Sequence, residues 1–441
     1  MKNDARRLLI VTSAFPPTML ADMHRARMLA QELPNHGWDI EVLTPGTRFQ
    51  RSLWVEPDAE VLRPNGVCVH QAALWCDWLF RWLGMSTVGW RALWPMYRLG
   101  AELFKTKRFD LVYISTTQFV LFCLGPLWRG RFGVPYILDF HDPWFRKKSE
   151  YVTTHNRFKR WMSNWLAKFL ESFAVRFAAG VVSVSPDYLF ELNSRHARLR
   201  RLESDRREVI PFAAAESDFE IRRTDEEARR GRGETMLRIV YTGAGGAIMA
   251  KSFSHIVDCL LLVKETTPEM LEGIRIQLFG TYAYWLPGEP KPLEEIAARK
   301  GADGLVEEHP ARISYLKAVD LIQNAHGLIV LGVDDPSYMP SKLFTYALTG
   351  RPLLACLHRD SQAAHYFTEI PNLGNLIRFD SQGPACLQNE RKIVLDFLCA
   401  VRRKEKIDRR KIIAPFLAPE MARRHAKLFE GCLADGKSKD K

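Results

Sequence analysis

A histidine and an aspartate follow a short apolar run in the first half of the chain. Residues 136–140 predict a buried strand, and His141 and Asp142 come next, ahead of Pro143. Because proline ends regular structure, both side chains are expected at the carboxyl edge of that strand, where we predict a catalytic role. Imidazole and carboxylate groups can hydrogen-bond hydroxyls or transfer a proton near neutral pH. The structural alternative is that Asp142 caps a turn and His141 is a satisfied core side chain.

A glycine-rich loop supplies a second candidate group. Residues 242–246 follow a predicted strand and precede a helix, so the backbone amides of Gly243 and Gly245 could approach a diphosphate. Lys251, just beyond the loop, could neutralise a departing nucleotide diphosphate. The spacing lacks a strict dinucleotide or P-loop pattern, so an ordinary tight turn followed by a solvated lysine remains an alternative.

A third candidate group lies at the start of a helix predicted from Pro340, with proline near its first turn. Ser341 and Lys342 could face phosphates or a ribose there, and Thr345 follows one turn later. The alternative is a well-capped helix whose apolar side chains simply pack in the core.

Short apolar runs alternate with helical patterns, which predicts an α/β fold with parallel sheets. Strands are expected at residues 8–11, 40–44, 111–115, 136–140, 180–185, 237–242, 274–279, 327–331 and 353–356. The helix expected at residues 22–33 carries Arg25, which could reach an acceptor phosphate or the donor pyrophosphate. A solvated helix arginine is an equal alternative.

The βα pattern is interrupted once by charge-rich sequence. We predict a Rossmann-like domain at residues 1–205, a linker at 206–236, a second Rossmann-like domain at 237–407, and a helical segment with a polar tail at 408–441. Two such domains in tandem would enclose a cleft, and ligands of open α/β sheets bind beyond the carboxyl ends of the strands.

The composition is that of a soluble globular protein. The 441 residues are 47% hydrophobic and 26% charged, which excludes collagen-like and disordered classes. Eight scattered cysteines without metal-ligand spacing predict buried thiols in a reducing compartment and no metal site.

The first apolar run, residues 8–11, is too short for a signal-peptide core, so we expect a cytoplasmic protein. The uncharged stretch 111–128 predicts a strand, a polar turn and a short core helix rather than a membrane span.

The net charge of +12 raises nucleic acid, anionic lipid or phosphate-bearing ligands as partners. Half of this excess lies in residues 143–178, which hold eight basic and two acidic side chains. Aromatic and apolar residues recur there at helical spacing: Phe158, Met162, Trp165, Phe169 and Phe173. A basic amphipathic helix of this kind predicts peripheral binding to the anionic inner face of a membrane, although the stripe could instead face the core. The tryptophan-rich tract 75–97 fits either an interfacial surface or a helical hairpin over the sheet.

The succession of these motifs resembles the GT-B glycosyltransferases of family 4 (group 1). The resemblance is carried by residues 8–17, 24–25, 37–44, 139–144 and 338–352, which cover most of the chain in the right order. It implies two Rossmann-like domains with a cleft between them, a nucleotide-sugar donor bound by the second domain, and retention of anomeric configuration. It also implies that His141 matches the histidine that lines the sugar site of the family.

The sequence also departs from this family. Many members carry two glutamates, seven residues apart, that contact the donor sugar and the ribose, and Ser337 and Thr345 fall on these positions. Asp334 and Asp335 lie just upstream and could substitute. An arginine usual near the glycine loop is replaced by Ala244, and the glycine run usual after the N-terminal proline pair is missing.

The main prediction is a glycosyltransferase that moves a sugar from a nucleotide-diphosphate donor to a glycan or lipid-linked acceptor in glycan or polysaccharide biosynthesis, without a cofactor. One alternative is a non-catalytic binding or scaffold protein of the same fold that has lost the glutamate pair. A nucleic-acid-binding protein is a further alternative, but no recognised nucleic-acid module is present and no such partner is expected. The absent dinucleotide fingerprint argues against a dehydrogenase.

Overall fold

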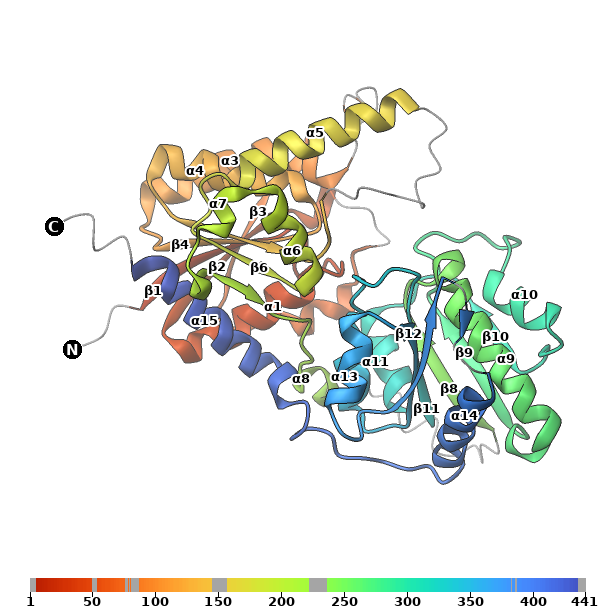
Figure 1. The fold of residues 1–441 in the computed structure, drawn as a ribbon. Coiled ribbons are helices and arrows are strands. Elements are labelled where there is room, and N and C mark those ends of the chain that lie inside the picture. The colour runs from red at the N-terminus through yellow and green to blue at the C-terminus, as the bar shows by residue number, and fades with distance from the viewer. Residues whose placement is uncertain are drawn as a thin grey trace. The chain divides into compact units, whose positions relative to one another are not determined.

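The computed structural model describes residues 5–49, 54–75, 78, 80, 87–144, 157–221, 236–381, 383–384 and 387–434. The chain forms two compact units (Figure 1). The first unit comprises Met1–Pro211 and Ala418–Lys441, and the second comprises Phe212–Leu417.

The first unit is built on a seven-stranded parallel sheet in the order β3-β2-β1-β4-β5-β6-β7. Its strands are β1 (Arg6–Val11), β2 (Trp38–Pro45), β3 (Cys68–Ala72), β4 (Leu111–Ser115), β5 (Tyr136–Phe140), β6 (Gly180–Ser183) and β7 (Arg207–Val209). Strands β4 and β5 are buried at every position, as expected where helices cover both faces of a parallel sheet.

Seven α-helices are described in the first unit. They are α1 (Met23–Glu32), α3 (Val88–Thr106), α4 (Leu124–Phe132), α5 (Arg157–Val175), α6 (Pro186–Arg195), α7 (Ala197–Arg200) and α15 (Ala418–Ala434). Short 3-10 helices are η1 (Leu33–His36), η2 (Thr47–Phe49), η4 (Pro57–Leu62), η5 (Phe119–Cys123) and η6 (Ser204–Arg206). Helix α1 passes into η1 where Pro34 removes a backbone donor, and Gly37 then turns the chain into β2 with a φ of 80°.

The second unit repeats this plan with the strand order β10-β9-β8-β11-β12-β13-β14, parallel except for the last pair. Its strands are β8 (Leu237–Thr242), β9 (Ile274–Phe279), β10 (Val306–His309), β11 (Gly327–Leu331), β12 (Leu353–His358), β13 (Asn375–Asp380) and β14 (Gly383–Pro384). Its helices are α8 (Ser217–Glu220), α9 (Ala250–Thr266), α10 (Pro292–Arg299), α11 (Tyr315–Gln323), α12 (Leu343–Leu348), α13 (Gln362–Glu369), α14 (Leu387–Arg402), η8 (Gly246–Met249), η9 (Pro268–Met270) and η10 (Ala414–Phe416).

Both faces of the second sheet are buried. Along β8, Ile239 and Tyr241 pack into one apolar cluster while Val240 packs into the other, following the two-residue period of a strand. The segment Gly246–Thr266 is long and apolar enough, by length and composition, to cross a membrane. Because its Phe253 and Leu260 pack in the core of this unit, that signal is weak evidence for a span.

The main sequence-based predictions of fold are confirmed. The first sheet is parallel and the second is parallel except for the β13–β14 pair, and the strands expected at 111–115, 136–140, 237–242, 274–279 and 327–331 have these bounds. The uncharged stretch 111–128 forms β4, η5 and the start of α4, as expected.

The domain boundaries differ from the expectation. Residues 207–209, expected in a linker, form β7 and pair with β6, and residues 217–220 form α8. The C-terminal helix α15, expected as a separate segment, belongs to the first unit, because its buried side chains such as Phe429 pack against Trp38 of β2. Of the charge-rich linker, residues 222–235 lie outside the described residues.

Candidate functional site

The strand orders place a topological switch point in each sheet, between β1 and β4 in the first and between β8 and β11 in the second. In open α/β sheets, ligands bind beyond the carboxyl ends of the strands at such a point. His141 follows β5, which neighbours the first switch point, and Gly243 follows β8 at the second. The predicted catalytic and glycine-loop residues therefore lie at the ends of the sheets where this fold binds ligands.

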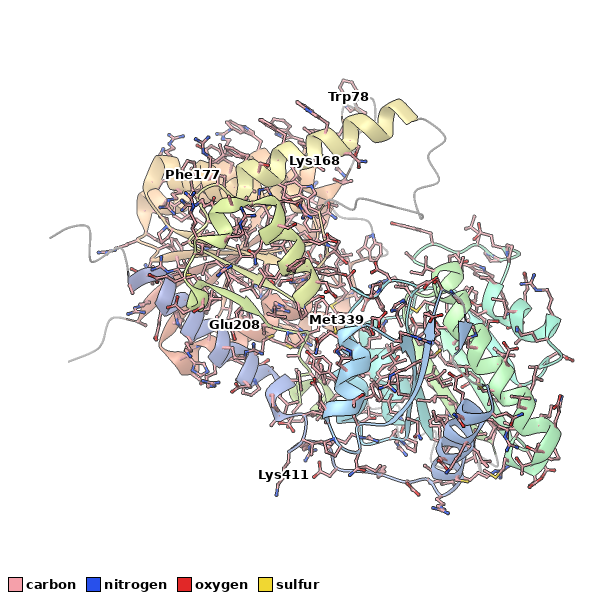
Figure 2. The ribbon with its side chains drawn as sticks, viewed as in Figure 1. Trp78, Lys168, Phe177, Glu208, Met339 and Lys411 are labelled. Carbon is pink, nitrogen blue, oxygen red and sulfur yellow. The ribbon has the colours of Figure 1, made fainter. Side chains whose placement is uncertain are left out.

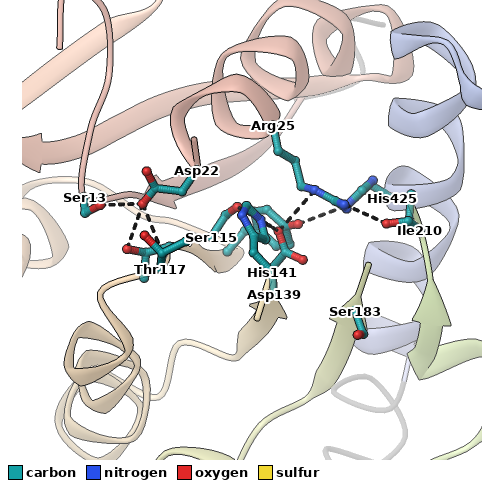
Figure 3. Close-up of polar contacts among 12 residues, drawn as sticks. Ser13, Asp22, Arg25, Ser115, Thr117, Asp139, His141, Ser183, Ile210 and His425 are labelled. Carbon is teal, nitrogen blue, oxygen red and sulfur yellow. Dashed lines mark hydrogen bonds and ion pairs between the residues drawn. The ribbon is translucent and has the colours of Figure 1, made fainter. Parts of the chain in front are cut away.

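His141 is nearly buried and is held by the strand that precedes it. Its Nε2 lies 2.7 Å from Oδ2 of Asp139 and 3.1 Å from Oγ of Ser115, the last residue of β4 (Figure 3). The Ser115 hydroxyl donates to the same carboxylate oxygen at 2.8 Å. These contacts show that Nε2 is the ring nitrogen that bonds to Asp139 and Ser115. The catalytic role of His141 stays a prediction.

Asp139 is fully buried, so burial alone would raise its pKa. The charges of Arg25 and His141 outweigh desolvation and hold the pKa of this carboxyl well below its ordinary value. Asp139 is therefore a carboxylate at neutral pH. Sequence reasoning missed it, because an aspartate inside an apolar run gives no indication of a charged partner from another element.

Arg25 does not lie at the surface as a substrate contact would require. Its side chain is 1% exposed, its Nε lies 3.5 Å from Oδ2 of Asp139, and its guanidinium donates to the backbone oxygen of Ile210 at 2.6 Å (Figure 3). The prediction that Arg25 reaches a substrate phosphate is therefore revised: its charge neutralises an interior carboxylate.

The C-terminal helix α15 closes the other side of this cluster with His425. Its Nδ1 donates to the Met421 backbone oxygen at 2.7 Å, and its Nε2 accepts from the Tyr113 hydroxyl at 2.9 Å. Burial and the neighbouring Arg25 lower the pKa of His425 to about 3, so this imidazole is neutral at ordinary pH.

A second acidic residue that sequence reasoning missed is Asp22, just before α1. It is fully buried, and its Oδ2 accepts from the Ser13 hydroxyl, from Oγ1 of Thr116 at 3.1 Å and from the Thr117 amide at 3.2 Å (Figure 3). These contacts join the loops after β1 and β4 to the first helix. Asp22 thus fixes the backbone on both sides of the first switch point.

The other predicted catalytic residue, Asp142, lies half-buried in the loop after β5. Two residues on, the Trp144 ring stacks on Phe119 at 5.6 Å, which anchors this loop to η5. Asp142 follows His141 in the chain, and the catalytic role of its carboxylate stays a prediction.

In the second unit, Gly243 and Lys342 come together. Gly243 has a φ of 113°, and a Cβ built on it would overlap the Lys342 ammonium. Lys342 also lies over the Tyr241 ring, 5.6 Å from its centroid. In the described part of the chain, no carboxylate lies within ion-pair distance of Lys342, and desolvation lowers the pKa of this half-buried lysine to about 8.

Helix α12 fixes the position of this lysine. Tyr346 lies one turn after Lys342, and its hydroxyl accepts from the Thr242 amide at 2.8 Å, which holds this face of the helix at the end of β8. The helix begins at Leu343 rather than at the predicted Pro340, so Ser341 lies in the preceding turn and is exposed. Its contact with a phosphate stays a prediction. Thr345 is half-buried on α12.

The remaining predicted residues lie near this loop with separate partners. Lys251 pairs with Asp334, with Nζ 2.9 Å from Oδ2, and both side chains are about one third exposed. Gly245 has a φ of −154° and a ψ of −85°, and its amide donates to the Thr281 backbone oxygen at 3.0 Å.

One cluster among the described residues has the composition of a metal site. Glu41, Cys68 and His70, on β2 and β3, offer ligand atoms within 4.8 Å of one another. The Lys107 ammonium, however, lies 2.8 Å from both oxygens of Glu41 and already neutralises it. The arrangement is accounted for by an ion pair with a neighbouring histidine.

Comparison with known proteins agrees with this geometry. Residues 24–213 match the family model described as a glycosyl transferase 4-like domain. None of the curated proteins compared matches the sequence significantly.

Solved structures resemble the chain over nearly its whole length. Sucrose-phosphate synthase of Thermosynechococcus elongatus is 13% identical, with 98% of this chain and 100% of that chain covered and a TM-score of 0.61. The α,α-trehalose 6-phosphate synthase of Burkholderia multivorans is 10% identical, with 99% and 98% covered and a TM-score of 0.61. Anabaena HepE in complex with UDP-glucose is 14% identical, with 98% and 99% covered and a TM-score of 0.56. These likenesses establish the GT-B fold, with two Rossmann-like domains.

For a GT-B chain resembling family 4, the structure distinguishes the two aspartates that could replace the missing glutamates. Asp335 accepts from the backbone amide of Ser337 at 2.9 Å and from its hydroxyl at 2.6 Å, so it is engaged in a local turn. Asp334 lies beside Lys251, and its Oδ1 is 3.9 Å from Nε2 of His358 at the end of β12. Asp334 is thus the better candidate.

Proposed function

We propose that this protein is a glycosyltransferase that moves a sugar from a nucleotide-diphosphate donor to a glycan or lipid-linked acceptor, with retention of anomeric configuration. The observation that carries the proposal is the contact between Lys342 and Gly243 at the switch point of the second sheet. The match of residues 24–213 to a glycosyl transferase 4-like domain and the GT-B fold of the chain support it.

The second unit would bind the donor diphosphate. Desolvation disfavours the charged form of Lys342, and a bound dianion would offset that cost by supplying the absent negative partner. A cation fixed at this point also favours departure of the nucleotide diphosphate, because negative charge develops there as the glycosidic bond breaks. The backbone of Gly243, which has no side chain, lets the phosphate approach. Lys251 would add a second cation, and Ser341 and Thr345 would supply polar contacts.

The first unit would hold the acceptor and act on the sugar through His141. With Nε2 bonded to Asp139, His141 would offer the rest of its ring to sugar hydroxyls, as its resemblance to the family's sugar-site histidine implies. Asp142, next along the loop, would hydrogen-bond the acceptor or handle a proton. No step of this proposal requires a cofactor.

We further propose that the first unit binds the anionic inner face of a membrane. On α5, Trp165 and Phe169 are each 59% exposed and stack on one another with centroids 5.9 Å apart. Figure 2 shows Lys168 on the same helix and Phe177 just beyond it. Exposed aromatics beside basic residues suit the lipid headgroup region. The predicted basic residues at 146–148 lie outside the described residues, as do the side chains at 157–160.

A thermal-shift panel of UDP-, GDP- and other nucleotide sugars tests the donor site, because a ligand that binds only the folded protein stabilises it by mass action. UDP-glucose is the first to try, since it is the ligand in the HepE structure. We expect one nucleotide to raise the melting temperature of the wild type and of Lys317→Met, a control lysine exposed on α11, but not of Lys342→Met. A flat response across the whole panel would contradict the proposal.

The second candidate is a non-catalytic binding or scaffold protein, favoured by Ser337 and Thr345 at the positions of the family's glutamates. Transfer and donor hydrolysis should be measured in the wild type, His141→Ala and Lys251→Ala. Nucleotide binding without turnover in the wild type would favour the scaffold, whereas turnover insensitive to both substitutions would overturn the site assignment.

A further inference from the structure

We infer that Asp139 and Arg25 are positioning residues that fix His141 in one tautomer, with the proton on Nε2 and Nδ1 as the nitrogen that exchanges protons. The inference deepens the proposed function and rests on it only for the claim that His141 touches substrate. Its structural part concerns Arg25 on α1, Asp139 on β5 and His141 in the loop after β5.

The tautomer follows from the hydrogen bonds of one carboxylate oxygen. Oδ2 of Asp139 lies 2.7 Å from Nε2 of His141 and 2.8 Å from Oγ of Ser115. A carboxylate oxygen only accepts, so both groups must donate, and the proton of neutral His141 is on Nε2. The single hydroxyl hydrogen of Ser115 is used on Asp139, so its 3.1 Å contact with Nε2 is one in which Ser115 accepts. Nδ1 is therefore the nitrogen that gains or loses a proton.

Arg25 keeps the carboxylate in the form that this arrangement needs. Asp139 is fully buried, and a carboxyl in such a place would be protonated without a cation nearby. Arg25 supplies that cation at 3.5 Å, and its second bond, to the Ile210 backbone oxygen, holds the guanidinium in place. A protonated Asp139 could donate to Nε2 and invert the tautomer, so Arg25 acts on His141 through Asp139.

His425 and Tyr113 also face this cluster, and both have pKa values shifted away from neutral pH. His425, on α15, has its pKa lowered to about 3 by burial and by Arg25, and burial raises the pKa of Tyr113 well above its ordinary value. Asp22, before α1, accepts from the neighbouring Thr116 hydroxyl.

The test is a histidine-selective ¹⁵N NMR titration of the full chain, with the His141 signals assigned by their loss in His141→Gln. In the wild type, neutral His141 should show a protonated Nε2 and an unprotonated Nδ1. Asp139→Asn should reduce that tautomer, because an amide can donate to Nε2, and should move protonation of His141 to lower pH, because the imidazolium loses its counter-charge. Ser115→Ala removes one hydrogen bond to the carboxylate but leaves the charge of Asp139 in place, so it should change both readouts less than Asp139→Asn does.

Kinetics supply the second readout. Asp139→Asn should lower kcat by about 10²-fold or more with little change in KM for the donor, as expected for a group that orients an imidazole rather than binding substrate. Arg25→Lys, which keeps the positive charge, should retain more activity than Arg25→Met. If Asp139→Asn fails to fold because Arg25 is left unpaired, the double variant Arg25→Met/Asp139→Asn removes both charges and must show the same change at His141.

An unchanged tautomer and titration in both Asp139 variants would overturn the inference, whatever the activity. The outcomes also separate it from the proposed function, because the NMR experiment needs no substrate. A shifted titration in a protein without transferase activity would leave the positioning intact and count against the proposed function alone.

Discussion

Lys342 lies directly against Gly243, so close that any side chain on the glycine would overlap the lysine ammonium. Gly243 also has a φ of 113°, which side-chain-bearing residues rarely adopt. The backbone conformation thus favours glycine, and a side chain at this position would have to displace the flexible end of Lys342. The consequence is that a half-buried lysine without an acidic partner in the described chain lies at the carboxyl end of β8.

Gly243→Ala should therefore weaken nucleotide-diphosphate binding by about tenfold or more, because it displaces the cation that would meet the phosphates. It should also lower the free energy of unfolding by about 1–3 kcal/mol through backbone strain. Gly245→Ala is the comparison: its φ is −154°, and a Cβ there would lie 3.4 Å from Tyr241, so both effects should be smaller. Calorimetric titration and urea unfolding measure them, and equal losses in the two variants would contradict this account.

The pH dependence of binding and of stability should run in opposite directions. The pKa of Lys342 is lowered by desolvation from 10.5 to about 8, so the unfolded chain holds more protons than the folded chain between these values. The contribution of Lys342 to the free energy of unfolding therefore rises with pH through this window. Diphosphate binding needs the charged form and should weaken above about pH 8.

Lys342→Arg separates the two effects, because a guanidinium keeps its charge throughout this range. If the variant binds nucleotide at all, its affinity should not fall between pH 8 and 10. A wild-type affinity that stays constant over the same range would show that Lys342 does not meet the phosphates.

The strands most readily predicted were short apolar runs, such as β4 and β8, because burial on both faces of a parallel sheet leaves only apolar residues. The missed strands lack that signal. Strand β3 is an edge strand that carries His70 and Gln71, and β10 carries Glu307 and Glu308. Glu308 is buried because it accepts from two amides at the start of α10, a long-range contact that a local pattern does not reveal.

The same difference between local signals and long-range contacts applies to the candidate site. Gly243 and Lys342 could each be selected from local sequence, but their contact depends on Tyr346 holding α12 at Thr242. Arg25 was expected at a surface, since arginine is seldom buried without a partner, and its partner Asp139 comes from another part of the sheet. The sequence was therefore enough to select candidate residues in loops. The partner that neutralises a buried charge, such as Asp139 for Arg25, could be found only from the fold.

Lys251→Met should separate binding from stability in the second unit. The ion pair of Lys251 with Asp334 is about one third exposed on both sides, so its loss should cost less than about 1 kcal/mol of unfolding free energy. If Lys251 also meets the donor diphosphate, its loss should still weaken nucleotide binding several-fold. Asp334→Asn, which frees the lysine without removing its charge, should not weaken binding of inorganic pyrophosphate, which lacks the sugar and ribose that Asp334 is a candidate to contact. The opposite pattern, a large stability loss with unchanged binding, would make Lys251 a structural residue.

The exposed aromatic pair on α5 gives the last prediction. A fully buried aromatic side chain contributes about 1.5–3 kcal/mol, so Trp165→Ser/Phe169→Ser should lower partitioning onto anionic liposomes by on the order of 10²-fold. Both rings are more than half exposed, so thermal stability and nucleotide binding should change little. Leu286→Ser, at a 67% exposed position of the second unit, is the matched control and should bind liposomes as the wild type does. Co-sedimentation at low and high salt measures the effect, and the basic residues around α5 should make wild-type binding salt-sensitive. If the double variant still binds liposomes as tightly as the wild type, α5 does not meet the membrane.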